Sequence, residues 1–183
     1  MRNARSTQGG AAGALVAVAA MLAACGGQPV RSTAAASSPG GTCQGSSGNA
    51  SATTANYVIV LDVGPPEQMY SQQQVQSDHP TSGEVMLGGA MTDVSGPNVR
   101  HMEAHVCNRN SGAVVTGAQP VITLTDTTAG TAAKNVPVAE MEGIGEGTTD
   151  YHYGNNVVLQ PGHTFTVTVR LNGESAVMQY KPT

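Results

Sequence analysis

Potential metal ligands are concentrated in the stretch RHMEAHVCN, residues 100–108. Successive side chains of a β-strand point to opposite faces. A strand here therefore places His101, Glu103 and His105 together on one face, and the opposite face carries Met102, Ala104 and Val106. Imidazoles two residues apart can converge on one metal ion. The alternative is a solvated polar face, which any half-buried strand has.

A second segment, VPVAEMEGIGEGTTDYHYGNNVVL (136–159), adds acidic groups and another histidine. Four of the 12 carboxylates of the chain lie between residues 140 and 150, and no Lys or Arg lies among them. Such a concentration of negative charge attracts cations. Met141 and His152 add a thioether and an imidazole to this segment, so both segments carry ligand types that metals use.

Together the two segments resemble the periplasmic iron-transport auxiliary family, a copper-binding partner of a membrane iron permease. That family has a His-x-Glu-Ala strand, an apolar strand, a Pro-Met-Val-Ala stretch and a His-Tyr-Gly-x-Asn turn. The counterparts here are His101-Met102-Glu103-Ala104, QPVITLTD, Pro137-Val138-Ala139 and His152-Tyr153-Gly154-Asn155-Asn156. The similarity extends over roughly residues 57–180.

The resemblance implies an immunoglobulin-like β-sandwich with a metal site of His and Met ligands. His101 and His152 match ligand positions, and Glu103 matches a carboxylate beside the site. Val138 stands where the family has Met, so Met141 is the candidate replacement. The C-terminal histidine of the family has no counterpart, and His105 is the local candidate for that place.

This ligand set suits copper, iron or zinc, because imidazole binds all three and a thioether favours Cu(I). Ligation requires neutral imidazole, so we expect binding to weaken below about pH 6. The resemblance further implies a membrane iron permease as partner and a tendency to form homodimers.

The N-terminus resembles a bacterial lipoprotein signal. Two arginines precede a short apolar run that ends in Leu22-Ala23-Ala24-Cys25. We expect residues 1–24 to be a cleaved signal peptide and Cys25 to be lipidated, which anchors the protein to the extracytoplasmic face of the cell membrane. Residues 25–55 are rich in Gly, Ser, Thr and Ala and predict a flexible tether, followed by one folded domain at 56–183.

Two further cysteines remain, Cys43 and Cys107. In an exported protein, an even number of cysteines left after lipidation indicates a disulfide. The alternative is a free Cys107 thiol beside the histidines.

Strand signals dominate the folded part. The segment FTVTVRL (165–171) alternates apolar and polar residues, and Asn172-Gly173 after it predicts a hairpin. Further strands are expected at 57–63, 84–87, 101–106, 121–126, 134–141, 156–159 and 176–180. Short strands separated by turns predict an all-β, immunoglobulin-like antiparallel sandwich.

The net charge of −4 without a basic cluster argues against nucleic acid as a partner. No hydrolase or zinc-protease motif is present, so we expect no enzymatic activity. The main alternative to metal binding is a metal-free immunoglobulin-like envelope module for adhesion or partner binding. A separation of the His101 and His152 side chains within about 5 Å favours a shared ion, whereas a separation beyond about 10 Å favours the module.

Overall fold

The computed structural model of the chain describes Cys43 and residues 49–183. The expected signal peptide, the lipidation site Cys25 and most of the expected tether lie outside the described residues. Within the described part, no helix combines the length and the apolar character needed to cross a membrane.

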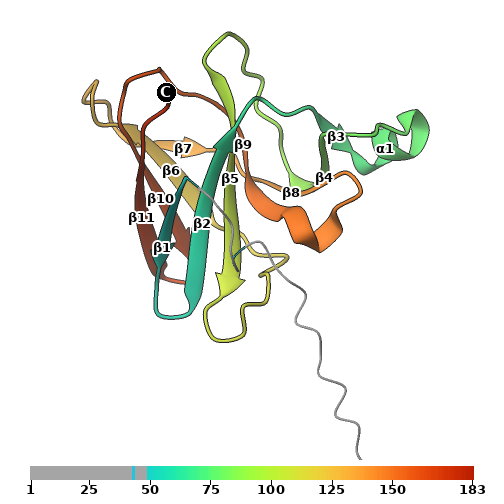
Figure 1. Cartoon of the computed structure of the whole chain (residues 1–183), viewed down its shortest axis with the longest axis horizontal. Coiled ribbons are helices and arrows are strands. Elements are labelled where there is room, and N and C mark those ends of the chain that lie inside the picture. Colours follow the sequence, from blue (N-terminus) through green and yellow to red (C-terminus); the bar gives the residue numbers. More distant parts are fainter. Residues whose placement is uncertain (1–42, 44–48) are drawn as a thin grey trace, which may run out of the picture. The chain divides into compact units, whose positions relative to one another are not determined.

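The larger of two sheets has the strand order β1-β2-β5-β9-β8-β4-β3 (Figure 1). Its strands are β1 (Ala50–Thr53), β2 (Tyr57–Gly64), β3 (Met69–Ser71), β4 (Glu84–Gly89), β5 (Val99–Asn108), β8 (Ala139–Gly143) and β9 (Tyr151–Val158). The smaller sheet has the order β11-β10-β6-β7. Its strands are β6 (Val121–Asp126), β7 (Lys134–Val136), β10 (Phe165–Leu171) and β11 (Glu174–Tyr180). Strand pairing is antiparallel apart from the parallel pair β3–β4.

The two sheets pack face to face, which confirms the predicted all-β sandwich. The core between them contains Met102, Ala104 and Val106 from β5 and the apolar face of β10. Figure 1 shows β8, β4 and β3 extending to one side, beyond the smaller sheet. Because β8 pairs with β9, this extension begins beside the strand that carries His152.

Part of the segment expected to be a tether forms the strand β1. Ala50–Thr53 pair in register with residues 58–61 of β2. The side chain of Asn49 accepts a hydrogen bond from the Val63 amide at 2.6 Å. Ala50 and Ala52 pack against the core. Small residues form this strand because β2 supplies its backbone partners, which composition alone does not indicate.

Residues 134–141, predicted as one strand, form two strands in different sheets. Pro137 lies between β7 and β8 and has no amide hydrogen to continue a ladder. The structure also contains a short helix, α1 (Gln72–Asp78), that was not predicted. Its start has a capping box, in which Ser71 and Gln74 each bond the backbone amide of the other.

A disulfide joins Cys43 to Cys107, as predicted from the even number of cysteines left after lipidation of Cys25. It closes a separation of 64 residues. Cys107 is 1% exposed and follows the histidines on β5, so it is not a free thiol beside them.

Candidate metal centre

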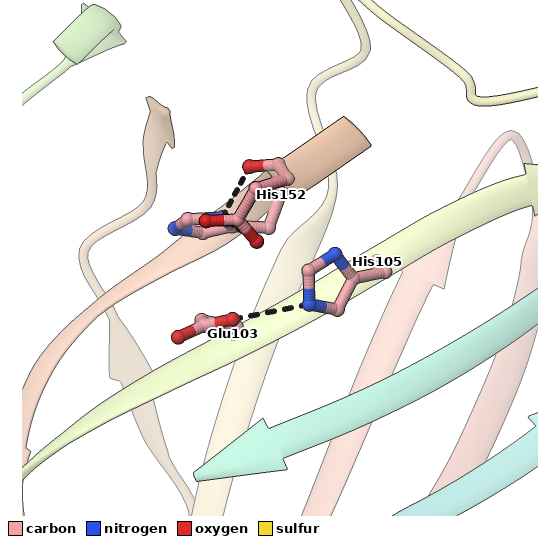
Figure 2. A group of neighbouring side chains, drawn as sticks. Glu103, His105 and His152 are labelled. Atoms are coloured by element: carbon pink, nitrogen blue, oxygen red, sulfur yellow. Dashed lines mark hydrogen bonds and ion pairs between the residues drawn. The ribbon is translucent and has the colours of Figure 1, made fainter. Parts of the chain in front are cut away.

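The ligand residues of β5 lie on the face of the larger sheet that points away from the core. Ala104 pairs with Tyr153 of β9, and both point into the core. His101, Glu103 and His105 therefore share the opposite face with His152, as the alternation predicts. Figure 2 shows the side chains of Glu103, His105 and His152 close together, with a dashed line between Glu103 and His105. The sandwich thus brings together the two segments singled out in the sequence.

This face is covered rather than solvated. His101 and His152 are 0% exposed and His105 is 3% exposed. Backbone hydrogen bonds tie the start of β4 to residues next to β3 and β8. The amide of Glu84 donates to the carbonyl of Gln68 at 2.9 Å, and the amide of Ile144 donates to that of Gly83 at 2.9 Å. Three buried imidazoles in a domain of this size require polar partners.

The orientations of the His101 and His152 rings fix where their lone pairs point. The Nδ1 atom of His101 lies 3.1 Å from Oδ1 of Asn156, which also accepts from the Glu67 amide. The Nδ1 atom of His152 lies 3.0 Å from the backbone carbonyl of Asp150. Both partners are acceptors, so each Nδ1 carries the ring hydrogen. Each neutral ring then has its lone pair on Nε2.

The two Nε2 atoms lie 3.3 Å apart. Two lone pairs at this distance repel unless a proton or a cation lies between them. Metal–nitrogen bonds of about 2.0–2.1 Å at a tetrahedral angle separate two ligand nitrogens by about 3.3–3.4 Å. The observed separation therefore matches two imidazoles on one tetrahedral ion. Hydrogen bonding of Nδ1 to a carbonyl or amide oxygen is also the usual support of a metal-bound histidine.

Gly154 permits the close approach of β5 and β9 beside this pair. It lies between His152 and Asn156 on the same face of the sheet. A Cβ atom at this position would lie 1.8 Å from the carbonyl oxygen of Met102. Only glycine fits there without moving the two strands apart, so Gly154 helps to set the distance between His101 and His152.

Burial favours the neutral, ligating form of His152. Burial lowers the pKa of His152 to about 4; nearby His105 and His101 act in the same direction, and Glu103 opposes them. At neutral pH the ring is therefore unprotonated and its Nε2 lone pair is available to a metal ion.

Glu84 is the third member of this buried group. Its side chain is 7% exposed and its Oε2 lies 3.8 Å from Nε2 of His152. Among the described residues, this oxygen is a buried side-chain atom without a hydrogen-bond partner. Burial and the carboxylates around it, Asp150 first, raise the pKa of Glu84 to about 8. A buried oxygen without a partner is costly, and a cation would remove that cost.

We expect Glu84 to make the metal-free protein less stable as the pH rises. Its raised pKa means that the folded state keeps a proton that the unfolded chain loses above pH 4.5. This contribution is complete below pH 4.5 and is lost as the pH rises to about 8. His152 acts in the opposite sense, because its lowered pKa gives stability that is present above pH 6.5 and lost as the pH falls to about 4. Above pH 6.5 the effect of Glu84 dominates.

The free energy of unfolding without metal should therefore fall by about 2 kcal/mol between pH 6.5 and 8. The change Glu84→Gln should remove most of this fall, as measured by urea denaturation in a chelator. The matched control is Glu142→Gln. Glu142 directly follows Met141 on β8, so its side chain lies on the opposite face of the sheet, and it pairs with Val85 of β4. An equal fall in the wild type and Glu84→Gln would show that Glu84 is ionised at neutral pH.

Glu103 and His105 continue the polar face beside this group. The Glu103 Oε1 lies 4.0 Å from Nε2 of His101, and its Oε2 lies 3.1 Å from Nε2 of His105. Burial raises the pKa of Glu103, but the hydrogen bond with His105 and the charges of the three histidines outweigh it, so the pKa is lowered overall. Glu103 is therefore an ionised carboxylate between two imidazoles.

Two sets of side chains are thus close enough to hold a metal ion. One consists of Glu84, His101 and His152, and the other of Glu103, His105, Asp150 and His152. Within each set the ligand atoms lie within 4.8 Å of one another. The sequence predicted His101, Glu103, His105 and His152 as members, and the structure brings all four together.

Met141 lies directly opposite His152 in the β8–β9 pairing, and therefore on the same face. It is fully buried and packs with Met69 and Ala139, with Met86 against them. Two other histidines stay away from the site. His79 is exposed at the end of α1, and Nδ1 of His163 bonds Asp126 at 2.7 Å.

Sequence reasoning missed Glu84 as a site residue and did not assign Asp150 a ligand role. Glu84 opens β4, far from the other ligands in sequence, and only the β4–β8–β9 pairing brings it to His152. A carboxylate at the start of an apolar strand was the one available signal. Asn156, which orients His101, lies in the quoted His-Tyr-Gly turn but gave no sign of that role.

Comparison of the chain with protein-family models, with curated proteins and with solved structures finds no match.

Proposed function

We propose that this protein binds a divalent transition-metal ion between His101 and His152, with Glu84 as a third ligand. The observation that carries the proposal is the pair of Nε2 atoms 3.3 Å apart, with both Nδ1 atoms held by acceptors. The separation lies within the 5 Å expected for a shared ion and far below the 10 Å expected for a metal-free module. Imidazole and carboxylate ligands suit Cu(II), Zn(II) and Fe(II).

The biological role that fits such a site best is copper or iron handling outside the cell. The lipoprotein-like N-terminus supports a location on the extracytoplasmic face of the membrane. The resemblance to the iron-transport auxiliary family supports delivery of metal to a membrane permease. Met141, on the same face as His152, is positioned to favour copper over zinc if its sulfur joins the ligands.

Metal titration against a competing chelator tests this function. The protein is purified without lipid through the change Cys25→Ser, with its disulfide intact, and is titrated with Cu(II), Zn(II) and Fe(II). We expect micromolar or tighter binding of at least one of them. Millimolar binding of all three would overturn the proposal.

The pH dependence of this affinity should follow Glu84 rather than histidine. The metal must displace the proton that Glu84 holds below pH 8, whereas His152 is already neutral down to about pH 4. Affinity should therefore fall by about tenfold per pH unit between pH 7.5 and 6. The variant Glu84→Gln should bind more weakly at pH 8 and show a flatter dependence. A constant wild-type affinity over this range would exclude Glu84 as a ligand.

A further inference from the structure

Glu103 lies beside both groups of ligands, which have His152 in common. One of its oxygens points toward His101 and the other toward His105, at 4.0 and 3.1 Å from their Nε2 atoms. A carboxylate in this position can bind one ion through each oxygen. On the His105 side, Asp150 and His152 complete a group whose ligand atoms lie within 4.8 Å of one another. The site thus contains ligands beyond those needed for the ion between His101 and His152.

The orientation of His105 matches that of the other two histidines. Its Nδ1 lies 3.1 Å from the backbone carbonyl of Tyr151, an acceptor, so Nδ1 carries hydrogen. Its Nε2 faces the carboxylate of Glu103. A lone pair and a carboxylate oxygen at this distance repel each other unless a positive charge, either a proton or a metal ion, lies between them. Three imidazoles are therefore held by Nδ1 with Nε2 directed into the same region.

Carboxylate side chains are concentrated around the site. A pocket of about 300 Å³ opens beside it and is lined by five carboxylates but by no Lys or Arg. These are Glu67, Glu84, Glu103, Glu146 and Asp150. Glu84, whose buried Oε2 lacks a hydrogen-bond partner, is one of the residues that line this pocket. Such a concentration of carboxylates without a Lys or Arg attracts cations, so a second cation beside the first is electrostatically favoured.

The two ligand groups also differ in exposure. The side chains of His101 and His152 are completely buried, whereas those of Glu103 and Asp150 are 18% and 25% exposed. A second ion beside Glu103 and Asp150 would be reached directly from the pocket.

We propose that the site holds two divalent transition-metal ions bridged by Glu103. One ion is bound by His101, His152 and Glu84, as in the proposed function on which this inference rests. The other is bound by His105 and Asp150. Paired metal ions in proteins typically lie about 3.5–4 Å apart, which a single bridging carboxylate can span.

Copper stoichiometry combined with electron paramagnetic resonance tests the pair. The lipid-free full chain is dialysed against Cu(II), and bound copper is counted while the spectrum is recorded. We expect two Cu(II) per chain. The first should give the signal of an isolated Cu(II). The second should reduce the signal intensity per copper or add a half-field line, because the two spins then interact.

The double variant His105→Gln/Asp150→Asn should bind one Cu(II) and keep the isolated signal. A matched control changes another adjacent His and Asp, His163→Gln/Asp126→Asn, on the smaller sheet. It should retain two interacting ions.

One non-interacting Cu(II) in the wild type would overturn the second position and leave the proposed function standing. Two ions that persist in the His105→Gln/Asp150→Asn variant would place the second ion elsewhere and also overturn it. No bound Cu(II) in the wild type, with Zn(II) and Fe(II) equally unbound, would refute the proposed function as well. The wild-type spectrum decides the question even if the double variant does not fold.

Discussion

Replacing His101 or His152 by alanine is expected to weaken metal binding by at least about 100-fold. Each change removes one of the two nitrogens that lie 3.3 Å apart on either side of the proposed ion. Loss of a residue that merely supports a ligand typically costs about 10–100-fold in metal affinity, so loss of a ligand should cost more. The two variants should be equally damaging, because neither half of the pair binds alone.

The measurement is a competition titration with Zn(II) and Cu(II) at pH 8, where the Glu84 proton interferes least. The matched control is His79→Asn. His79 is exposed and has a left-handed backbone conformation (φ 47°), which asparagine tolerates. This control removes an imidazole without touching the site and should keep wild-type affinity.

Equal binding by the wild type and both alanine variants would place the ion elsewhere. A large loss in only one variant would mean that the remaining histidine supports the fold rather than the metal. Circular dichroism of the metal-free variants separates loss of binding from loss of folding.

Removal of the Cys43–Cys107 disulfide is expected to lower the free energy of unfolding by about 4 kcal/mol. The bond closes a separation of 64 residues, and in the chain-entropy model the benefit rises with the length of the closed loop. Cys107 is buried on β5, two residues after His105. The bond therefore links Cys43 to the strand that supplies three candidate ligands.

This prediction is checked by urea denaturation of the wild type and of Cys43→Ala/Cys107→Ala. Both proteins carry Cys25→Ser, so that no free thiol remains to exchange. A parallel denaturation of the wild type in a reducing agent should reproduce the value of the double alanine variant. Unfolding free energies that agree within about 1 kcal/mol in all three samples would contradict the entropic argument.

The sequence predicted the fold best where strand alternation is complete. The segments 121–126 and 165–171 match β6 and β10, and the Asn172-Gly173 turn joins β10 to β11. Prediction failed where pairing with a neighbour, and not local composition, decides the structure. Ala50–Thr53 has the composition of a tether and becomes a strand only because the edge of β2 is available.

The candidate site, too, could be predicted where a local pattern places its residues and not where distant strand pairings do. The alternation on β5 correctly placed His101, Glu103 and His105 on one face, because a period of two is a local property. The meeting of His101 with His152 was expected from the resemblance and depends on the β5–β9 register, which spans about fifty residues of sequence. Glu84 could not be found, since its contact with His152 depends on two further strand pairings.

The most direct test of a metal ion between His101 and His152 is a crystal structure. The crystals are grown with Zn(II) or Cu(II), and anomalous diffraction is recorded at the absorption edge of the metal. We expect a strong anomalous peak about 2.0–2.1 Å from Nε2 of both His101 and His152. A map without a peak between these two atoms, or with its strongest peak at the His163–Asp126 pair, would contradict this expectation.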